Sequence, residues 1–146
     1  MKGKIRVDGA AYLILVLYLL LMPFPWVCGM LFAGFVHELG HCVALYLLGE
    51  RVLKISIGPF GAKIETMPMD ERCTVICALA GPAAGVILCL FWRWIPRTAF
   101  LALTQSVFNL LPIFPLDGGR ALRAVGGYRK EKAVAKSTVS VYNGSD

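Results

Sequence analysis

The apolar segment of residues 35–48 constrains the fold most, because it contains three ionisable side chains, His37, Glu38 and His41. In an α-helix, residues four apart lie on one face, so the two imidazoles can reach the same metal ion while Glu38 lies beside it. This H-E-x-x-H spacing is typical of zinc hydrolases. The chain has only two histidines, and both belong to the motif. A buried, purely structural histidine pair is the alternative interpretation.

The composition indicates where such a helix would lie. Of the 146 residues, 58% are hydrophobic and 16% are charged, whereas soluble domains average about 45–50% apolar and about 25% charged residues. An integral membrane protein with the lipid bilayer as its solvent is therefore expected, formed by a single domain of residues 1–146. Its core would span residues 27–122, and residues 123–146 would be a basic tail. The net charge of +6 does not indicate nucleic acid, because the basic residues separate apolar segments and form no single patch.

Four apolar segments predict about four transmembrane helices, at residues 9–22, 27–48, 73–92 and from about 98 through the prolines at 112 and 115. The first resembles a signal peptide in charge and length, but it lacks a small-residue cleavage site and runs into a Pro-Phe-Pro-Trp turn at residues 23–26. Gly49 is expected to end the second helix. Alternating residues at 51–66, around Gly-Pro-Phe-Gly, predict a small β-hairpin after the metal-motif helix. The fold class is thus an all-α membrane protein with this hairpin, which is either a connector or an edge strand for an extended substrate.

The basic residues predict an orientation. If the four helices alternate, thirteen of the fifteen Lys and Arg residues lie on one side of the membrane, and only Arg93 and Arg97 lie on the other. By the positive-inside rule, both termini and the hairpin are then cytoplasmic. The metal motif lies near the cytoplasmic end of the second helix.

A catalytic zinc site needs a third protein ligand and one open position. The candidates for this ligand are carboxylates outside the motif, namely Glu50, Glu65, Asp70, Glu71 and Asp117. Asp117 is favoured because it follows Pro112 and Pro115, precedes two glycines and reaches the same side as the motif; a plain turn is the alternative for Asp-Gly-Gly. Cys73 and Cys77 could share a metal, but no third ligand follows them closely.

With these residues in view, the sequence resembles the site-2 proteases, a family of zinc metalloproteases that cut substrates within or next to the membrane. The resemblance rests on HELGH at 37–41, AGP at 80–82 and NLLPIFPLDGGR at 109–120. It covers residues 30–122, and Gly85 departs from it, because many relatives carry asparagine there. The layout is most similar to a compact bacterial branch that includes a sporulation protease acting on a sigma-factor precursor.

The resemblance implies a multi-pass protein of the bacterial cell membrane that holds one Zn²⁺ per chain on His37, His41 and Asp117. It also implies that Glu38 is the catalytic base and that Asn109 steadies the substrate or the oxyanion. The expected substrate is a membrane-associated protein with helix-weakening residues near the cut, because a regular helix hides its carbonyls in hydrogen bonds.

Two other functions stay open at this stage. An inactive relative could act as a zinc-binding scaffold or regulator, although it would not need a glutamate between the histidines. A small metal transporter could use the same histidines and aspartate as a pathway, although the apolar segments offer few further polar residues.

Overall fold

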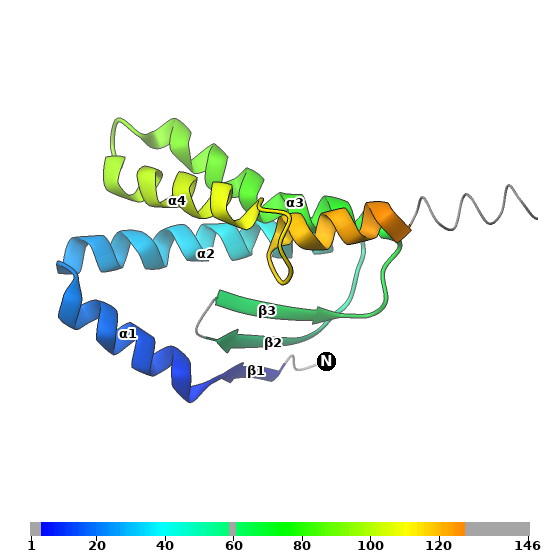
Figure 1. The fold of residues 1–146 in the computed structure, drawn as a ribbon, viewed down its shortest axis with the longest axis horizontal. Helices are drawn as coiled ribbons and strands as arrows, with labels where there is room; N and C mark the ends of the chain where they lie inside the picture. Colours follow the sequence, from blue (N-terminus) through cyan, green and yellow to red (C-terminus); the bar gives the residue numbers. More distant parts are fainter. Residues whose placement is uncertain (1–3, 59–60, 128–146) are drawn as a thin grey trace, which may run out of the picture.

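The structure is a computed structural model and describes residues 4–58 and 61–127. Its elements are β1 (Lys4–Val7), α1 (Gly9–Leu21), α2 (Phe24–Leu47), β2 (Val52–Gly58), β3 (Gly61–Thr66), α3 (Glu71–Leu88), the 3₁₀ turn η1 (Cys89–Phe91) and α4 (Pro96–Asn109). Residues 117–127 are also helical. In Figure 1 the sheet lies along α2 on the side away from α4, and α1 descends from the start of α2 to the sheet.

Helices α2, α3 and α4 pack against one another through small residues. Gly40 on α2 lies so close to α3 that a methyl group there would be 2.5 Å from the carbonyl oxygen of Ala80. Ala33 of α2 and Ala102 of α4 are buried in a common cluster with Leu88. Small side chains let helix backbones approach closely where lipid gives no hydrophobic driving force. Small residues therefore allow close packing among all three helices.

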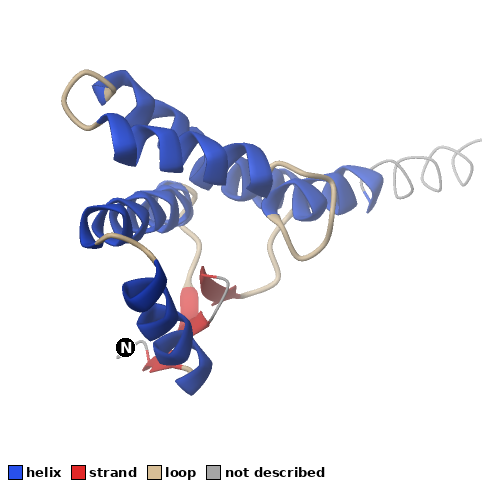
Figure 2. Ribbon diagram, turned by 60° about the vertical axis from the view of Figure 1, so that its left-hand side comes forward, coloured by secondary structure: helices blue, strands red, loops and turns tan. Residues whose placement is uncertain are grey.

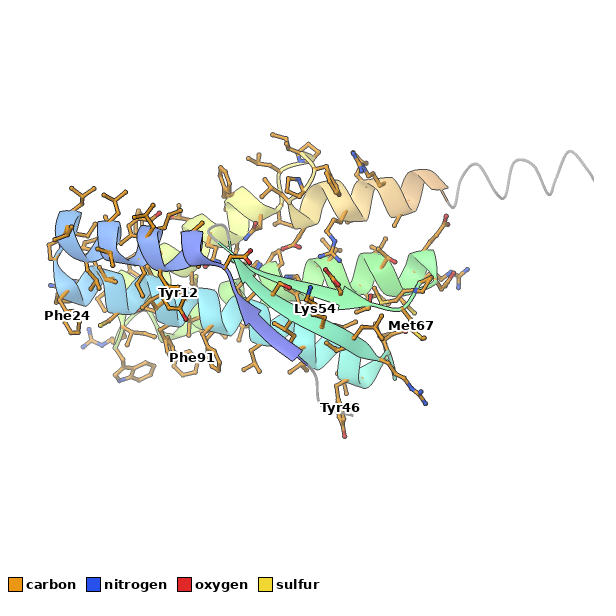
Figure 3. The ribbon with its side chains drawn as sticks, turned by 90° about the horizontal axis from the view of Figure 1, so that it is seen from below. Tyr12, Phe24, Tyr46, Lys54, Met67 and Phe91 are labelled. Atoms are coloured by element: carbon orange, nitrogen blue, oxygen red, sulfur yellow. The ribbon has the colours of Figure 1, made fainter. Side chains whose placement is uncertain are left out.

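Large apolar side chains cover the outside of the molecule. Tyr46, Leu20 and Leu90 are each more than three-quarters exposed, and Figure 3 shows Tyr46 projecting away from its helix. Soluble monomers rarely expose large continuous apolar areas. This surface suits contact with lipid.

The prediction of four transmembrane helices is only partly met. Among the described residues, Phe24–Leu47 and Glu71–Phe91 are long and apolar enough to cross a membrane. Helix α1 has 13 residues and α4 has 14, which at 1.5 Å per residue gives each a length of about 20 Å. A bilayer core is about 30 Å thick, so neither helix spans it alone.

The sheet has three strands, so the expectation of a simple hairpin was incomplete. Strands β2 and β3 are antiparallel, as predicted, and β1 pairs in parallel with the other side of β2. The sheet order β1-β2-β3 makes β2 the central strand. Figure 2 shows the strands together on one side of the helices. A parallel partner needs a long connection, which α1 and α2 supply here.

The predicted breaks in the helices lie close to the expected places. Gly49 has a φ of +73° and follows α2, and the amide of Glu50 donates to the carbonyl of Leu45 to close the helix end. The turn at residues 23–26 is shorter than expected, because α2 already begins at Phe24 with proline in its first turn. After α4 the chain is irregular through Pro112 and Pro115. A helix then starts at residue 117 and includes the first residues of the predicted basic tail. The rest of that tail, residues 128–146, lies outside the described residues.

Candidate functional site

Two histidines of α2 face the interior of the helix layer. His37 and His41 are 3% and 6% exposed, and their Nε2 atoms are 3.3 Å apart. The regular helix between Phe24 and Leu47 places them on one face, as the spacing predicted. Two imidazole nitrogens therefore point to the same small space.

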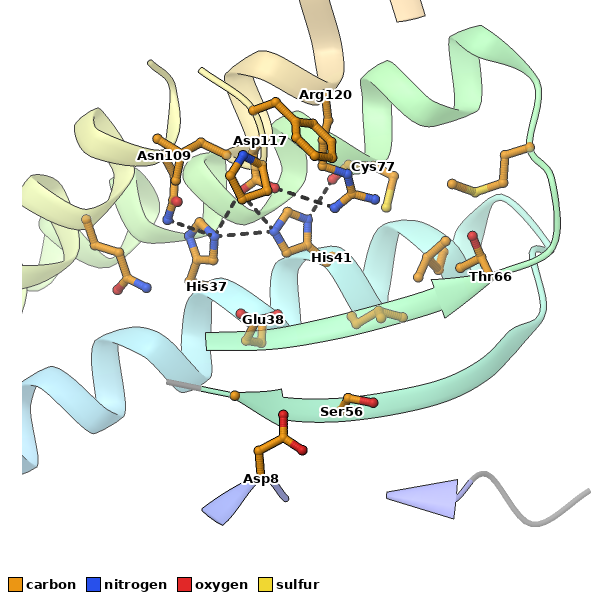
Figure 4. Close-up of a pocket in the computed structure, with 18 residues that line it drawn as sticks. Asp8, His37, Glu38, His41, Ser56, Thr66, Cys77, Asn109, Asp117 and Arg120 are labelled. Atoms are coloured by element: carbon orange, nitrogen blue, oxygen red, sulfur yellow. Dashed lines mark hydrogen bonds and ion pairs between the residues drawn. The ribbon is translucent and has the colours of Figure 1, made fainter. Parts of the chain in front are cut away.

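Asp117 reaches this space although it follows His37 by 80 residues in the sequence. Its Oδ2 atom lies 3.1 Å from Nε2 of His37 and 3.2 Å from Nε2 of His41, and the residue is buried. It is the first residue of the helix formed by 117–127. Because the irregular segment after α4 reverses the chain, that helix begins next to α2. Figure 4 shows the three side chains converging.

The spacing of these three atoms fits a tetrahedral zinc ion. Zn–N and Zn–O distances are about 2.0–2.1 Å, so two ligand atoms of a tetrahedron are about 3.3–3.4 Å apart. The three measured separations are 3.1, 3.2 and 3.3 Å. Among the described residues, this is the group of His, Cys, Asp and Glu side chains that could hold a metal. Glu50, Glu65, Asp70 and Glu71, the other carboxylates considered, do not join it, and neither do Cys73 and Cys77.

A backbone carbonyl fixes the orientation of the second histidine. Nδ1 of His41 is 2.8 Å from the carbonyl oxygen of Cys77 on α3. A carbonyl can only accept, so Nδ1 donates, and Nε2 of the neutral imidazole keeps its lone pair for a metal ion. Nδ1 of His37, by contrast, is buried and has no hydrogen-bond partner among the described residues.

Gly81 of α3 leaves room for the two imidazoles. A methyl group at this position would clash with Nε2 of His41 and would lie 2.9 Å from Nε2 of His37. Gly81 belongs to the Ala-Gly-Pro motif that carries the resemblance, but its close contact with the two imidazoles was not predicted. At Gly85 a methyl group would clash instead with the hydroxyl of Ser106.

Glu38 and Asn109 border the same site. A cavity of about 450 Å³ is lined by Glu38, Asn109 and the three candidate ligands. Nδ2 of Asn109, at the end of α4, is 3.3 Å from Nε2 of His37 and is a hydrogen-bond donor. Glu38 is half-buried. The structure thus brings together all five residues that the sequence singled out.

Arg120 was quoted in the motif but received no role from the sequence. Its Nη1 atom lies 3.7 Å from Oδ1 of Asp117, one turn along the same helix. This is the oxygen that does not face the histidines. The i, i+3 spacing of Asp and Arg was the available signal, but it is informative only once residues 117–127 are known to be helical.

The chain resembles several known proteins, although no model of a known protein family matches it. A zinc metalloprotease of Methanocaldococcus jannaschii is 31% identical over 120 residues, and stage IV sporulation protein FB of Bacillus subtilis is 30% identical over 136 residues. The matches cover 68% and 82% of this chain but only 35% and 46% of those proteins, so the chain spans between a third and a half of their lengths. Among solved structures, a site-2 protease from Methanocaldococcus jannaschii is similar to this chain, with a TM-score of 0.69 and 26% sequence identity. The match covers 83% of this chain and 66% of the solved protease chain.

Proposed function

Since the chain belongs to the site-2 protease family of zinc metalloproteases, we propose that it is an endopeptidase that cuts membrane-associated proteins within or next to a transmembrane segment. Zn²⁺ is the cofactor. The observation that carries the proposal is the convergence of His37, His41 and Asp117 beside a glutamate on a long apolar helix.

We assign His37, His41 and Asp117 as the ligands of one zinc ion. When bound, zinc acts as a Lewis acid that lowers the pKa of a water molecule toward about 7 and polarises the peptide carbonyl. Glu38, one residue from His37 and lining the same cavity, takes the proton from the attacking water and passes it to the leaving amine. Three ligands leave one position open for water and substrate.

We assign the oxyanion contact to Asn109. Its Nδ2 donor is 3.3 Å from a ligand nitrogen and lines the same cavity, so it is close enough to contact the carbonyl oxygen of a substrate held there. A fixed donor there favours the transition state over the ground state.

Strand β3 supports a way to hold the unwound substrate. It is an edge of the sheet, and Ile64 and Thr66 line the cavity that contains the metal ligands. An extended peptide could pair with the free edge of β3 and present its backbone to the site. Ile55 and Ile57 cannot take this role, because both lie in β2, which pairs on both sides.

The two long apolar helices and the family indicate a membrane protein. We propose further that the chain is a single catalytic domain that crosses the bacterial cell membrane more than once, with its termini and metal site toward the cytoplasm. The excess of Lys and Arg outside the segment between α3 and α4 supports this orientation. The likeness to stage IV sporulation protein FB supports a sporulation sigma-factor precursor as one substrate.

The first test compares the purified parent protein with its Glu38→Gln variant in detergent. Bound zinc and cleavage of a panel of single-span membrane proteins are measured for both. We expect about one zinc per chain in each, with cleavage by the parent alone. Zinc binding without any cleavage by the parent would favour a zinc-binding scaffold, and loss of zinc from both would contradict the assigned site.

A further inference from the structure

A second, apolar cavity adjoins the metal site. It has a volume of about 870 Å³ and lies between α1, α2 and α4, with side chains such as Tyr12, Leu39 and Phe108 in its wall. Both cavities are lined by Glu38, Gly58, Ile64 and Gln105. A peptide that leaves the apolar cavity for the metal site therefore passes these four residues.

Gln105 is the uncharged polar side chain at this junction. It is half-buried on α4, and its carboxamide forms no hydrogen bond with any residue that the structure describes. The neighbouring polar side chains of the same helix differ, because the hydroxyl of Thr104 donates to the carbonyl of Phe100 and that of Ser106 donates to the carbonyl of Ala102. Gln105 alone among these three keeps its donor and acceptor available to a ligand.

The carboxamide of Gln105 lines both cavities and is not among the fully buried polar atoms, so its donors and its acceptor are open to a ligand that enters either cavity. The chemistry that would match it is a peptide main chain. A carboxamide offers one acceptor and two donors, and an unwound peptide offers N–H and C=O groups that a transmembrane helix would otherwise keep paired. Such a bond forms only after the substrate has unwound.

We propose that Gln105 binds the main chain of the substrate where it passes from the apolar cavity to the metal site. This inference rests on the proposed proteolytic function. Gln105 precedes Asn109 by four residues on α4, which is about 6 Å along a helix. An extended peptide advances about 3.3 Å per residue, so the contacted peptide group lies about two residues from the one held by Asn109. Main-chain binding makes this contact independent of the side chains of the substrate.

The test uses Gln105→Leu, which keeps a similar size and removes the hydrogen-bonding groups. Thr104→Val is the matched control, because it removes a neighbouring hydroxyl that is already bonded within the helix. Zinc content is measured for each variant. Affinity for a single-span substrate is measured in the Glu38→Gln background, where no cleavage occurs, and kcat/KM is measured with Glu38 intact.

The substrate is also made with single amide-to-ester replacements at each position within three residues of the cut. We expect Gln105→Leu to lower both affinity and kcat/KM about tenfold, without loss of zinc, whereas Thr104→Val changes neither. One ester, two residues from the cut, should lower the affinity of the protein that carries Gln105 about tenfold. The same ester should have no further effect in Gln105→Leu.

Three results would overturn the inference. The first is unchanged substrate affinity in Gln105→Leu. The second is an ester replacement that lowers affinity equally with and without Gln105. The third is loss of zinc from Gln105→Leu, which would mean that the carboxamide supports His37 instead. If the parent protein cleaves in any of these cases, the role of Gln105 is contradicted but the proposed proteolysis is not. If affinity depends on Gln105 but the parent cleaves nothing, substrate binding is supported and proteolysis is contradicted.

Discussion

Gly81 lies where a side chain on α3 would enter the space between the two histidines. Gly81→Ala should therefore displace the imidazoles and abolish both zinc binding and cleavage, even though alanine favours a helix by about 1 kcal/mol over glycine. Zinc per chain after gel filtration, measured by metal analysis, checks this. Gly126→Ala is the control, because its added methyl meets nothing within 4 Å, and it should keep its zinc.

Arg120 contacts the oxygen of Asp117 that does not face the histidines. Removing its charge should free the carboxylate to rotate and weaken zinc binding about tenfold, within the range known for partners of metal ligands. Competition with a chromogenic chelator would measure the affinity of Arg120→Gln. Arg97→Gln, at the start of α4, should match the parent, and equal affinity in the two variants would remove Arg120 from the site.

For individual residues, the sequence was sufficient where the chemistry follows from residue type and spacing. His37, Glu38 and His41 lie within about one turn of one helix, so local geometry alone predicted their relation. Asp117 was favoured among the carboxylates by its place after two prolines, whereas Asn109 received a role only from the resemblance to a family, because its approach to α2 depends on how the chain folds back. Gly81, Arg120 and Gln105 could not be singled out, since each acquires its contact only when separate helices pack.

At the scale of elements, the contact of α2 with α3 depends on Gly40. A methyl group there would meet the Ala80 carbonyl oxygen at 2.5 Å and the Ala84 Cβ at 2.8 Å. Gly40→Ala should force the helices apart and destabilise the protein by about 1–3 kcal/mol. Thermal unfolding in detergent measures this. Gly34→Ala on the same helix has its nearest contact at 3.9 Å, so it should unfold at or slightly above the temperature of the parent.

The edge of β3 that faces away from β2 gives a second prediction at the scale of secondary-structure elements. Neighbouring N–H groups of a strand point to opposite edges, and proline removes this donor. One of Ile64→Pro and Glu65→Pro should therefore break the pairing with β2 and lower the unfolding temperature. The other should leave stability intact and slow cleavage. Alanine at each position is the control, and full activity in both proline variants would remove strand pairing from the mechanism.

The elements were predictable where a pattern is local. The apolar runs and the alternation in residues 51–66 predicted α2, α3, β2 and β3 within a few residues. Strand β1 was missed because four residues between charged positions carry no distinct periodicity, and their pairing with β2 is a long-range contact. The crossing of the membrane by α1 and α4 is not confirmed, because these helices have 13 and 14 residues, fewer than the about 20 that a span normally needs.

For the whole molecule, the metal site joins α2 to the helix of residues 117–127. Removing zinc should lower the unfolding temperature by several degrees, because a ligand present at a thousand times its Kd stabilises the folded state by about 4 kcal/mol. Unfolding of the parent with and without EDTA measures this shift. Glu38→Gln should show the same shift as the parent, whereas Asp117→Asn should show a much smaller one. An EDTA effect that persists unchanged in Asp117→Asn would argue against the assigned ligand.

The 80 residues between His37 and Asp117 also affect how the protein is made. A ribosome delivers the two histidines and Glu38 long before the aspartate, so the growing chain enters the membrane without a complete set of ligands. The third proposed ligand is therefore in place only after α3 and α4 have been made, so the zinc site of a growing chain is completed much later than its two histidines are synthesised.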